Sequence, residues 1–242
     1  MTTDCQDCPL RRQPLFVPMT ADELAFQRRF KAGERQLSTG EEILRQGESS
    51  DALYTVLSGM AVRSVVMEDG RRQVIGFVFP GDFIGLQSGL MGEARHTVSA
   101  ATDMVLCTFP RGRVWTLFKT QPARAYDMTW IAAVEEHFLG ETVATLGQRD
   151  ATERVAWALV RIWRRLVALK MAVDGAVPFP FRQQDLADAL GLSVVHTNRV
   201  IVALRRAGLA EITGRRLVMH DHASLSQVAR LDMDKEDVRP IL

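Results

Sequence analysis

Between residues 35 and 109 the chain consists of short apolar segments interrupted by glycines, and this pattern restricts the fold more than any other feature. The segments are rich in Val, Ile, Phe and Thr, as in "DALYTVLSGMAVRSVVMEDGRRQVIGFVFPGDFIG". Asp69-Gly70 is a hairpin signal between the strands expected at 61–67 and 73–79. Many short strands without helices between them predict a closed or sandwiched antiparallel barrel.

Beyond residue 110 the strand pattern gives way to a helical one. Apolar residues recur at intervals of three and four from 121 to 146, which predicts one long helix. Its apolar face is broader than one contact requires, so we expect part of it to pack on the barrel and part on the same helix of a second copy. The alternative is a helix buried wholly in its own domain. The residues expected at the dimer contact are Ile131, Val134, Phe138, Leu139, Val143 and Leu146.

The last third of the chain has the pattern of a helix-turn-helix. A helix expected over 151–172 is ended by the glycine and prolines of "VDGAVPFPF". In "FRQQDLADALGLSVVHTNRVIVALRRAGL" a short helix, the turn Gly191-Leu192-Ser193 and a second helix follow one another. Ser193 suits the N-cap of the second helix. Strands at 210–213 and 216–219 around a glycine predict a small hairpin, the wing of a winged helix.

Charge is concentrated in this part of the chain. The whole protein has a formal net charge of only +1. From 182 to 216, however, six arginines stand against three acidic residues, a local charge of +3. This excess lies where a nucleic-acid duplex would dock, because side chains early in the second helix point toward base edges in the major groove.

Composition and the N-terminal sequence indicate a cytoplasmic protein. The chain is 47% hydrophobic and 24% charged, which is ordinary for a globular protein. The start "MTTDCQDC" is not that of a signal peptide, and no uncharged apolar run reaches the roughly 18 residues of a membrane helix. In a reducing cytoplasm the three cysteines are expected to be free, redox-active or metal-bound rather than paired in a disulfide.

Enzymatic function is not expected. A metalloenzyme of the cupin type needs several histidines and a carboxylate on neighbouring strands, whereas the strand region contains only His96. His220 and His222 follow the wing without partner residues and are expected in a solvated loop. No nucleophile–base set or phosphate-binding glycine loop is evident. A haem gas sensor with His96 or His137 as ligand stays open as an alternative.

The combination and order of these parts resemble the CRP/FNR-type transcription regulators over nearly the whole chain. The residues that carry the resemblance are "GDFIG", the long helix and "QQDLADALGLSVVHTNRVIVALRRAGL". It implies an α+β fold: an eight-stranded antiparallel β-roll of the cyclic-nucleotide-binding jelly-roll type (1–120), a dimerisation helix (121–148) and a winged helix-turn-helix domain (149–242). It also implies a homodimer that binds a pseudo-palindromic promoter site in double-stranded DNA and acts with RNA polymerase.

The resemblance places the DNA contacts on two helices and the wing. The recognition helices of the family commonly carry a glutamate and an arginine, whereas only the arginine, Arg199, is retained here and Val195 replaces the glutamate. A half-site different from the family's usual one is therefore expected. Arg199 can bind guanine in bidentate fashion, and Asn198 can read adenine. The full set of expected DNA-contacting residues is Arg182, Gln184, Ser193, Val195, His196, Asn198, Arg199, Arg215 and Arg216.

The same resemblance indicates which ligands the β-roll is expected to bind as its signal. The branch that binds cyclic AMP carries a glutamate after "GDFIG" for the ribose and an Arg-Ser pair for the phosphate. Here Leu86 follows that turn, and His96 follows Arg95. Cyclic AMP is therefore not the expected ligand, although a regulator responding to another small molecule or a cyclic nucleotide stays an alternative.

In the FNR branch N-terminal cysteines and one cysteine of the roll hold a 4Fe–4S cluster. "CQDC" supplies Cys5 and Cys8, and Cys107 stands at the distant position, but a third N-terminal cysteine is missing. Since four thiolates are the usual ligand set, a cluster here would need a non-cysteine fourth ligand such as Asp4, Asp7 or a histidine. The alternatives are a reversible thiol switch without metal, some other signal, or cysteines without a function.

Overall fold

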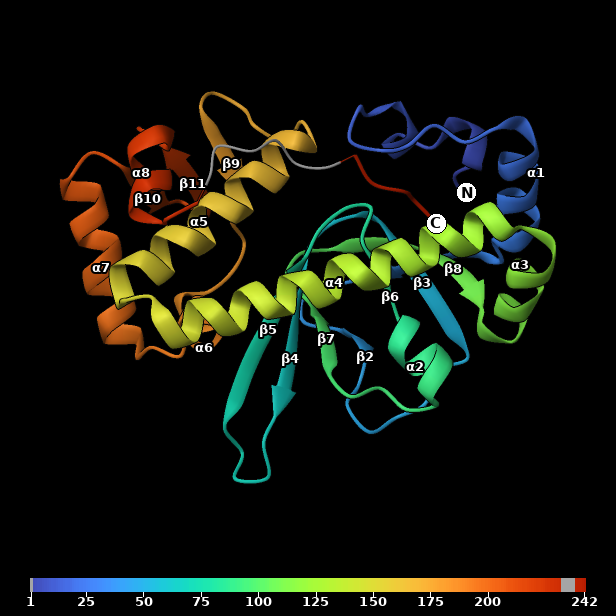
Figure 1. Ribbon diagram of the computed structural model, residues 1–242, viewed down its shortest axis with the longest axis horizontal. Helices are drawn as coiled ribbons and strands as arrows, with labels where there is room; N and C mark the ends of the chain where they lie inside the picture. The colour runs from blue at the N-terminus through green and yellow to red at the C-terminus, as the bar shows by residue number, and fades with distance from the viewer. Residues whose placement is uncertain (1, 232–237) are drawn as a thin grey trace. The chain divides into compact units, whose positions relative to one another are not determined.

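The structure is a computed structural model that describes residues 2–231 and 238–242 (Figure 1). The chain divides into two compact units, which we describe separately. Unit 1 comprises Met1–Arg71, Gly76–His137 and Val238–Leu242, and unit 2 comprises Arg72–Ile75 and Phe138–Asp237. Among the described residues, no helix is both long and apolar enough to span a bilayer.

The core of the first half of the chain lies between two four-stranded antiparallel sheets, with strand orders β1-β8-β3-β6 and β2-β7-β4-β5. Residues from both sheets meet in it, among them Val56, Val98 and Leu106, none of which is exposed. The strands are β1 (Gly33–Leu37), β2 (Glu42–Leu44), β3 (Ala52–Ser58), β4 (Ala61–Val66), β5 (Arg72–Val78), β6 (Phe83–Ile84), β7 (Thr97–Ala100) and β8 (Met104–Pro110). The predicted eight-stranded roll is confirmed.

The hairpin signal at Asp69-Gly70 is also confirmed. β4 and β5 are neighbours in their sheet, and the turn between them is closed by hydrogen bonds from Gly70 N to Met67 O (2.9 Å) and from Met67 N to Arg71 O (2.8 Å). Gly70 has a φ of 81°, a conformation that glycine adopts without steric cost.

Short helices flank the roll. These are the 3-10 helices η1 (Cys5–Asp7), η2 (Leu10–Arg12) and η3 (Arg111–Arg113), and the α-helices α1 (Ala21–Phe30), α2 (Leu86–Met91) and α3 (Val114–Thr120). Helix α1 was not predicted, although Thr20 and Glu23 form a capping box at its start that is visible in the sequence. A second apolar cluster, which includes Phe30 and Phe109, packs α1 on the roll.

The predicted long helix is α4 (Pro122–Gln148), whose first part belongs to unit 1 and whose last part belongs to unit 2. Helix α5 (Ala151–Ala168) follows, with Asp150 as its N-cap. It ends before residue 172, the predicted end, because Lys170 takes a positive φ of 54° that no α-helix continues.

Unit 2 is completed by a winged helix. Its elements are β9 (Ala176–Pro178), α6 (Gln183–Leu190), α7 (Val194–Arg206), β10 (Ala210–Thr213), β11 (Arg216–Met219) and α8 (His222–Val228). The strands form one antiparallel sheet in the order β10-β11-β9. The expectation of a solvated loop around His222 is wrong, because Asp221 caps α8 there by accepting a hydrogen bond from Ser224 N (3.0 Å).

The segment Val238–Leu242, which the sequence analysis grouped with the DNA-binding domain, packs in unit 1 instead. The reason is apolar burial, since Ile241 and Leu242 are each only 4% exposed.

Candidate nucleic-acid interface and thiol pocket

Residues of the local sequence favour the turn between α6 and α7. Gly191 ends α6 in the left-handed conformation with a φ of 62°, which is the usual C-terminal role of glycine. Ser193 Oγ then accepts a hydrogen bond from His196 N (3.2 Å) and caps α7, as predicted. Thr197 and Leu186 are fully buried and fix the two helices in unit 2. The geometry is that of a rigid helix-turn-helix.

The first two turns of α7 present the predicted base-reading residues to solvent. Val195 is 62% exposed, and His196, Asn198 and Arg199 are exposed as well. Within the described part of the chain, the Arg199 side chain has no hydrogen bond or ion pair, so its guanidinium donors are available. Asn198 Oδ1 accepts a weak hydrogen bond from Gln183 Nε2 (3.4 Å), which links the starts of α6 and α7. Asn198 and Arg199 line an open groove that continues along α7 to Arg206.

The predicted phosphate contacts are exposed but already have partners within unit 2. Arg182 Nε lies 3.3 Å from Asp185 Oδ2, while its side chain is 77% exposed. Gln184 bonds Asp188 along the same face of α6. In the wing, Arg215 and Arg216 donate to the carbonyls of Pro180 and Val173, respectively. These bonds orient the side chains without burying them.

Some of the residues predicted for dimerisation pack inside the chain, and others are exposed to solvent. Ile131 is buried in the cluster of unit 1, and Phe138 stacks on Trp157 of α5 with ring centroids 6.2 Å apart. Val134 and Leu146 are half-buried. Leu139 and Val143 are 46% and 70% exposed and are the members of this set that a second copy can contact.

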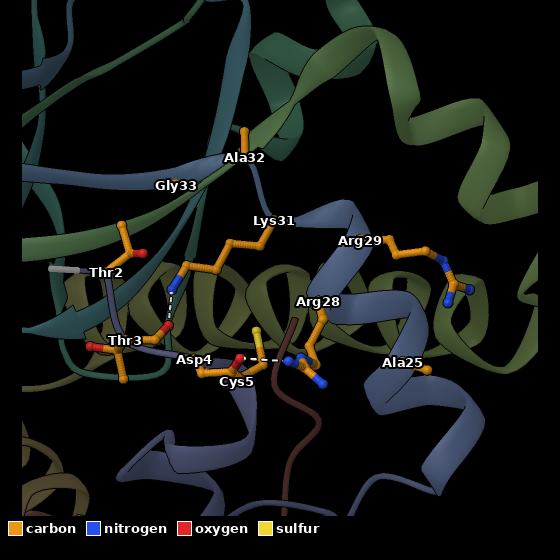
Figure 2. A pocket seen from close by; sticks show the side chains of 10 residues that line it. All are labelled: Thr2, Thr3, Asp4, Cys5, Ala25, Arg28, Arg29, Lys31, Ala32 and Gly33. Carbon is orange, nitrogen blue, oxygen red and sulfur yellow. Dashed lines mark hydrogen bonds and ion pairs between the residues drawn. The ribbon is translucent and has the colours of Figure 1, made fainter.

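Cys107 is far from Cys5 and Cys8 in sequence, yet all three cysteines line one small pocket of unit 1. Cys5 lies in η1 and Cys8 directly after it, while Cys107 lies on β8 opposite Glu34 of β1. Lys31, at the end of α1, lines the same pocket with a side chain that is only 8% exposed. Its Nζ donates to Thr3 O and to Glu34 Oε1, each at 2.7 Å, and Figure 2 shows it pointing toward the N-terminal strip that carries Cys5.

Electrostatics in this pocket favour protonated thiols. Burial raises the pKa of the Cys107 thiol to about 11, and the nearby Lys31 ammonium opposes this only in part. Burial likewise raises the pKa of Cys5. In the closed pocket both groups are therefore neutral at physiological pH and poor nucleophiles.

As arranged, the pocket does not fit an iron–sulfur cluster with four ligands. The two carboxylates considered as fourth ligands face arginines, since Asp4 lies 2.8 Å from Arg28 (Figure 2) and Asp7 lies 3.9 Å from Arg12. Among residues 2–231 and 238–242, no three His, Cys, Asp or Glu side chains form a group that could hold a metal ion. The free volume beside the thiols is about 30 Å³.

His96, the alternative haem ligand, is half-buried beside Arg63, and burial together with that charge lowers its pKa from 6.5 to about 4. Protonation therefore costs more in the folded than in the unfolded protein, and stability present above pH 6.5 is lost as the pH falls toward 4. We expect H96N to weaken this pH dependence. Urea midpoints at pH 7.5 and 4.5 measure it, with H196N at an exposed site as the control. Equal dependence in both variants would contradict the prediction.

Comparisons with known proteins cover both units. Residues 34–121 match the model of the cyclic nucleotide-binding domain, and residues 153–228 match that of the Crp-like helix-turn-helix domain. The transcriptional activator protein FnrL of Cereibacter sphaeroides is 31% identical over 95% of this chain and 93% of its own. The nitrogen fixation regulation protein FixK of Bradyrhizobium diazoefficiens is 31% identical over 94% and 92%.

Solved structures agree with this. FixK2 from Bradyrhizobium japonicum superposes with a TM-score of 0.73 at 28% identity, covering 81% of this chain and 96% of its own. A CRP-family regulator from Thermus thermophilus, TTHB099, has a TM-score of 0.67 over 83% of this chain and 98% of its own at 23% identity, which shows the shared fold.

Proposed function

The chain belongs to the CRP/FNR family of transcription regulators, on the FNR-like side, and from this premise we propose that it binds a pseudo-palindromic promoter site as a homodimer. The observation that carries the proposal is the rigid presentation of Arg199 and its neighbours at the start of α7. Such a protein acts in the cytoplasm, by binding DNA and RNA polymerase rather than by catalysis.

Base reading is assigned to the first turns of α7. The Arg199 guanidinium donates two parallel hydrogen bonds to O6 and N7 of guanine, and Asn198 pairs in the same way with adenine. Val195, which has no polar group, contacts the methyl group of a thymine. Arg182, Gln184, Arg215 and Arg216 contact phosphates and set the orientation of the domain without reading sequence.

The dimer is assigned to the exposed face of α4 that includes Leu139 and Val143. Two recognition helices related by a twofold axis then enter successive major grooves about 34 Å apart. Selection of bound duplexes from a random pool tests this. We expect a two-part, inverted-repeat site with half-site centres about ten base pairs apart. Binding of a single, unrepeated half-site by a monomer would contradict the proposal.

We further propose that unit 1 responds to redox state through Cys5, Cys8 and Cys107. The support is that every cysteine of the chain lines one pocket with a buried ammonium. Oxidation of the Cys107 thiol together with one of the two N-terminal thiols by hydrogen peroxide forms one disulfide, transfers two electrons to the peroxide and yields two water molecules.

Peroxide should change the affinity for the selected site, and C107S should abolish that change because it removes the thiol on the sheet. DNA-binding isotherms in reductant and after peroxide measure the effect. Iron and sulfide analysis of anaerobically purified protein separates this chemistry from a cluster. Stoichiometric iron and sulfide would overturn the thiol proposal and require that the pocket rearrange.

A further inference from the structure

The segment Val238–Leu242 docks on unit 1 as a short parallel addition to residues 15–17. Arg239 N donates to Leu15 O (2.9 Å), and Val17 N donates to Arg239 O (3.0 Å). The Arg239 guanidinium also lies 3.4 Å from Asp82, with both side chains nearly buried. The backbone hydrogen bonds therefore fix the register of the segment, and the ion pair adds a match of opposite charges.

Two buried polar side chains hold the end of this segment. Arg124, which is 3% exposed, donates to the Ile241 carbonyl, and Thr55 Oγ1 donates to the Leu242 carbonyl. The Leu242 side chain enters the apolar cluster of unit 1 that contains Phe30 and Phe109. Arg124 also pairs with Asp127 (2.6 Å), and the Ile241 carbonyl gives its buried guanidinium a second acceptor.

Ile241 and Leu242 of this segment form one wall of the thiol pocket. Ile241 and Leu242 line it together with all three cysteines and Lys31. With them in place, the cavity beside the thiols has a volume of about 30 Å³, which is enough to admit water. The three cysteines are half-buried with this wall in place, so the wall restricts access to the thiols and its movement widens that access.

We propose that Val238–Leu242 is a removable cover of the thiol pocket: docked, it limits the access of oxidants to the half-buried Cys8 and Cys107, and released, it exposes both thiols further. This inference deepens the proposed redox role and rests on it for its biological meaning. The segment is short and is held by two backbone hydrogen bonds, one ion pair and two side chains, so it opens at lower cost than the sheets beneath it. The segment also follows α8 along the chain, so it is covalently joined to the DNA-binding unit.

Alkylation by iodoacetamide under native conditions tests the cover, since each reacting thiolate forms a carbon–sulfur bond and releases iodide. We expect removal of residues 238–242, or the single change L242D, to raise the rates at Cys8 and Cys107 at least about tenfold, as read by peptide mass spectrometry. V238D is the matched control, because Val238 is in the same segment but 56% exposed, and its rates should stay within about twofold of the unchanged protein. Unchanged rates in L242D would overturn the proposal.

Hydrogen exchange of the unaltered full-length protein gives a second readout that does not depend on how the variants fold. The amides of Val17 and Arg239 should exchange together and at least about tenfold faster than those of β8. Equal protection of these amides and of β8 would show that the segment opens only when the roll unfolds, and would overturn the proposal. Faster alkylation in L242D without any peroxide effect on DNA binding would instead confirm the cover and refute the redox role alone.

Discussion

The R199A variant is expected to bind the selected DNA site about 10- to 100-fold more weakly, because it removes a bidentate contact to guanine worth roughly 1–3 kcal/mol. The affinity of R199A for random duplex should fall far less, because the contact that it loses is to a specific base and not to a phosphate. Fluorescence anisotropy with both duplexes at a single stated salt concentration measures the two effects together.

R205A is the matched control for this prediction. It removes the same charge from the same helix, but at the C-terminal end of α7, away from the turns that enter the groove. It should weaken binding to specific and random duplex by similar factors, leaving their ratio unchanged. A similar loss on both duplexes in R199A would show that Arg199 contacts phosphate and not a base.

The L186A variant is expected to lower the free energy of unfolding of unit 2 by about 2–5 kcal/mol. Leu186 is fully buried between the helices of the winged helix, and shortening it leaves a cavity that the packed helices fill only in part. Urea unfolding at a fixed protein concentration measures the effect on this unit when it is followed by tryptophan fluorescence in a W115F/W130F background, in which Trp157 and Trp163 are the tryptophans that remain.

V195A is the control, because Val195 lies on the exposed face of α7 and its truncation should change stability by less than about 0.5 kcal/mol. A loss below about 1 kcal/mol in L186A would mean that the core of unit 2 closes around the shortened side chain.

The parts of the fold that the sequence predicted well are those with strong local signals. Asp69-Gly70 identifies the β4–β5 hairpin, and Gly191 with Ser193 marks both ends of the turn between α6 and α7. Each signal depends on the backbone preferences of one or two residues, which hold in almost any tertiary setting. The exposure of Asn198 and Arg199 was also predictable, because the apolar residues of α7 recur at helical spacing and leave these two residues on the other face.

The parts that the sequence did not predict depend on contacts between distant residues. Lys31 lines the pocket of the cysteines because α1 packs on the roll beside β8, and no spacing in the chain indicates that. Helix α2 contains Gly89 and is only six residues long, so its periodicity is too weak to detect. The pairing of Arg239 with Leu15 and Val17 joins opposite ends of the chain and leaves no local pattern.

That long-range pairing also has a consequence for biosynthesis. A ribosome releases the β-roll, then α4 and the winged helix, before residues 238–242 emerge. Until then the nascent roll lacks Ile241 and Leu242, and the pocket that holds its cysteines lacks one of its walls. The arrival of residues 238–242 is thus the step that adds this wall to the pocket.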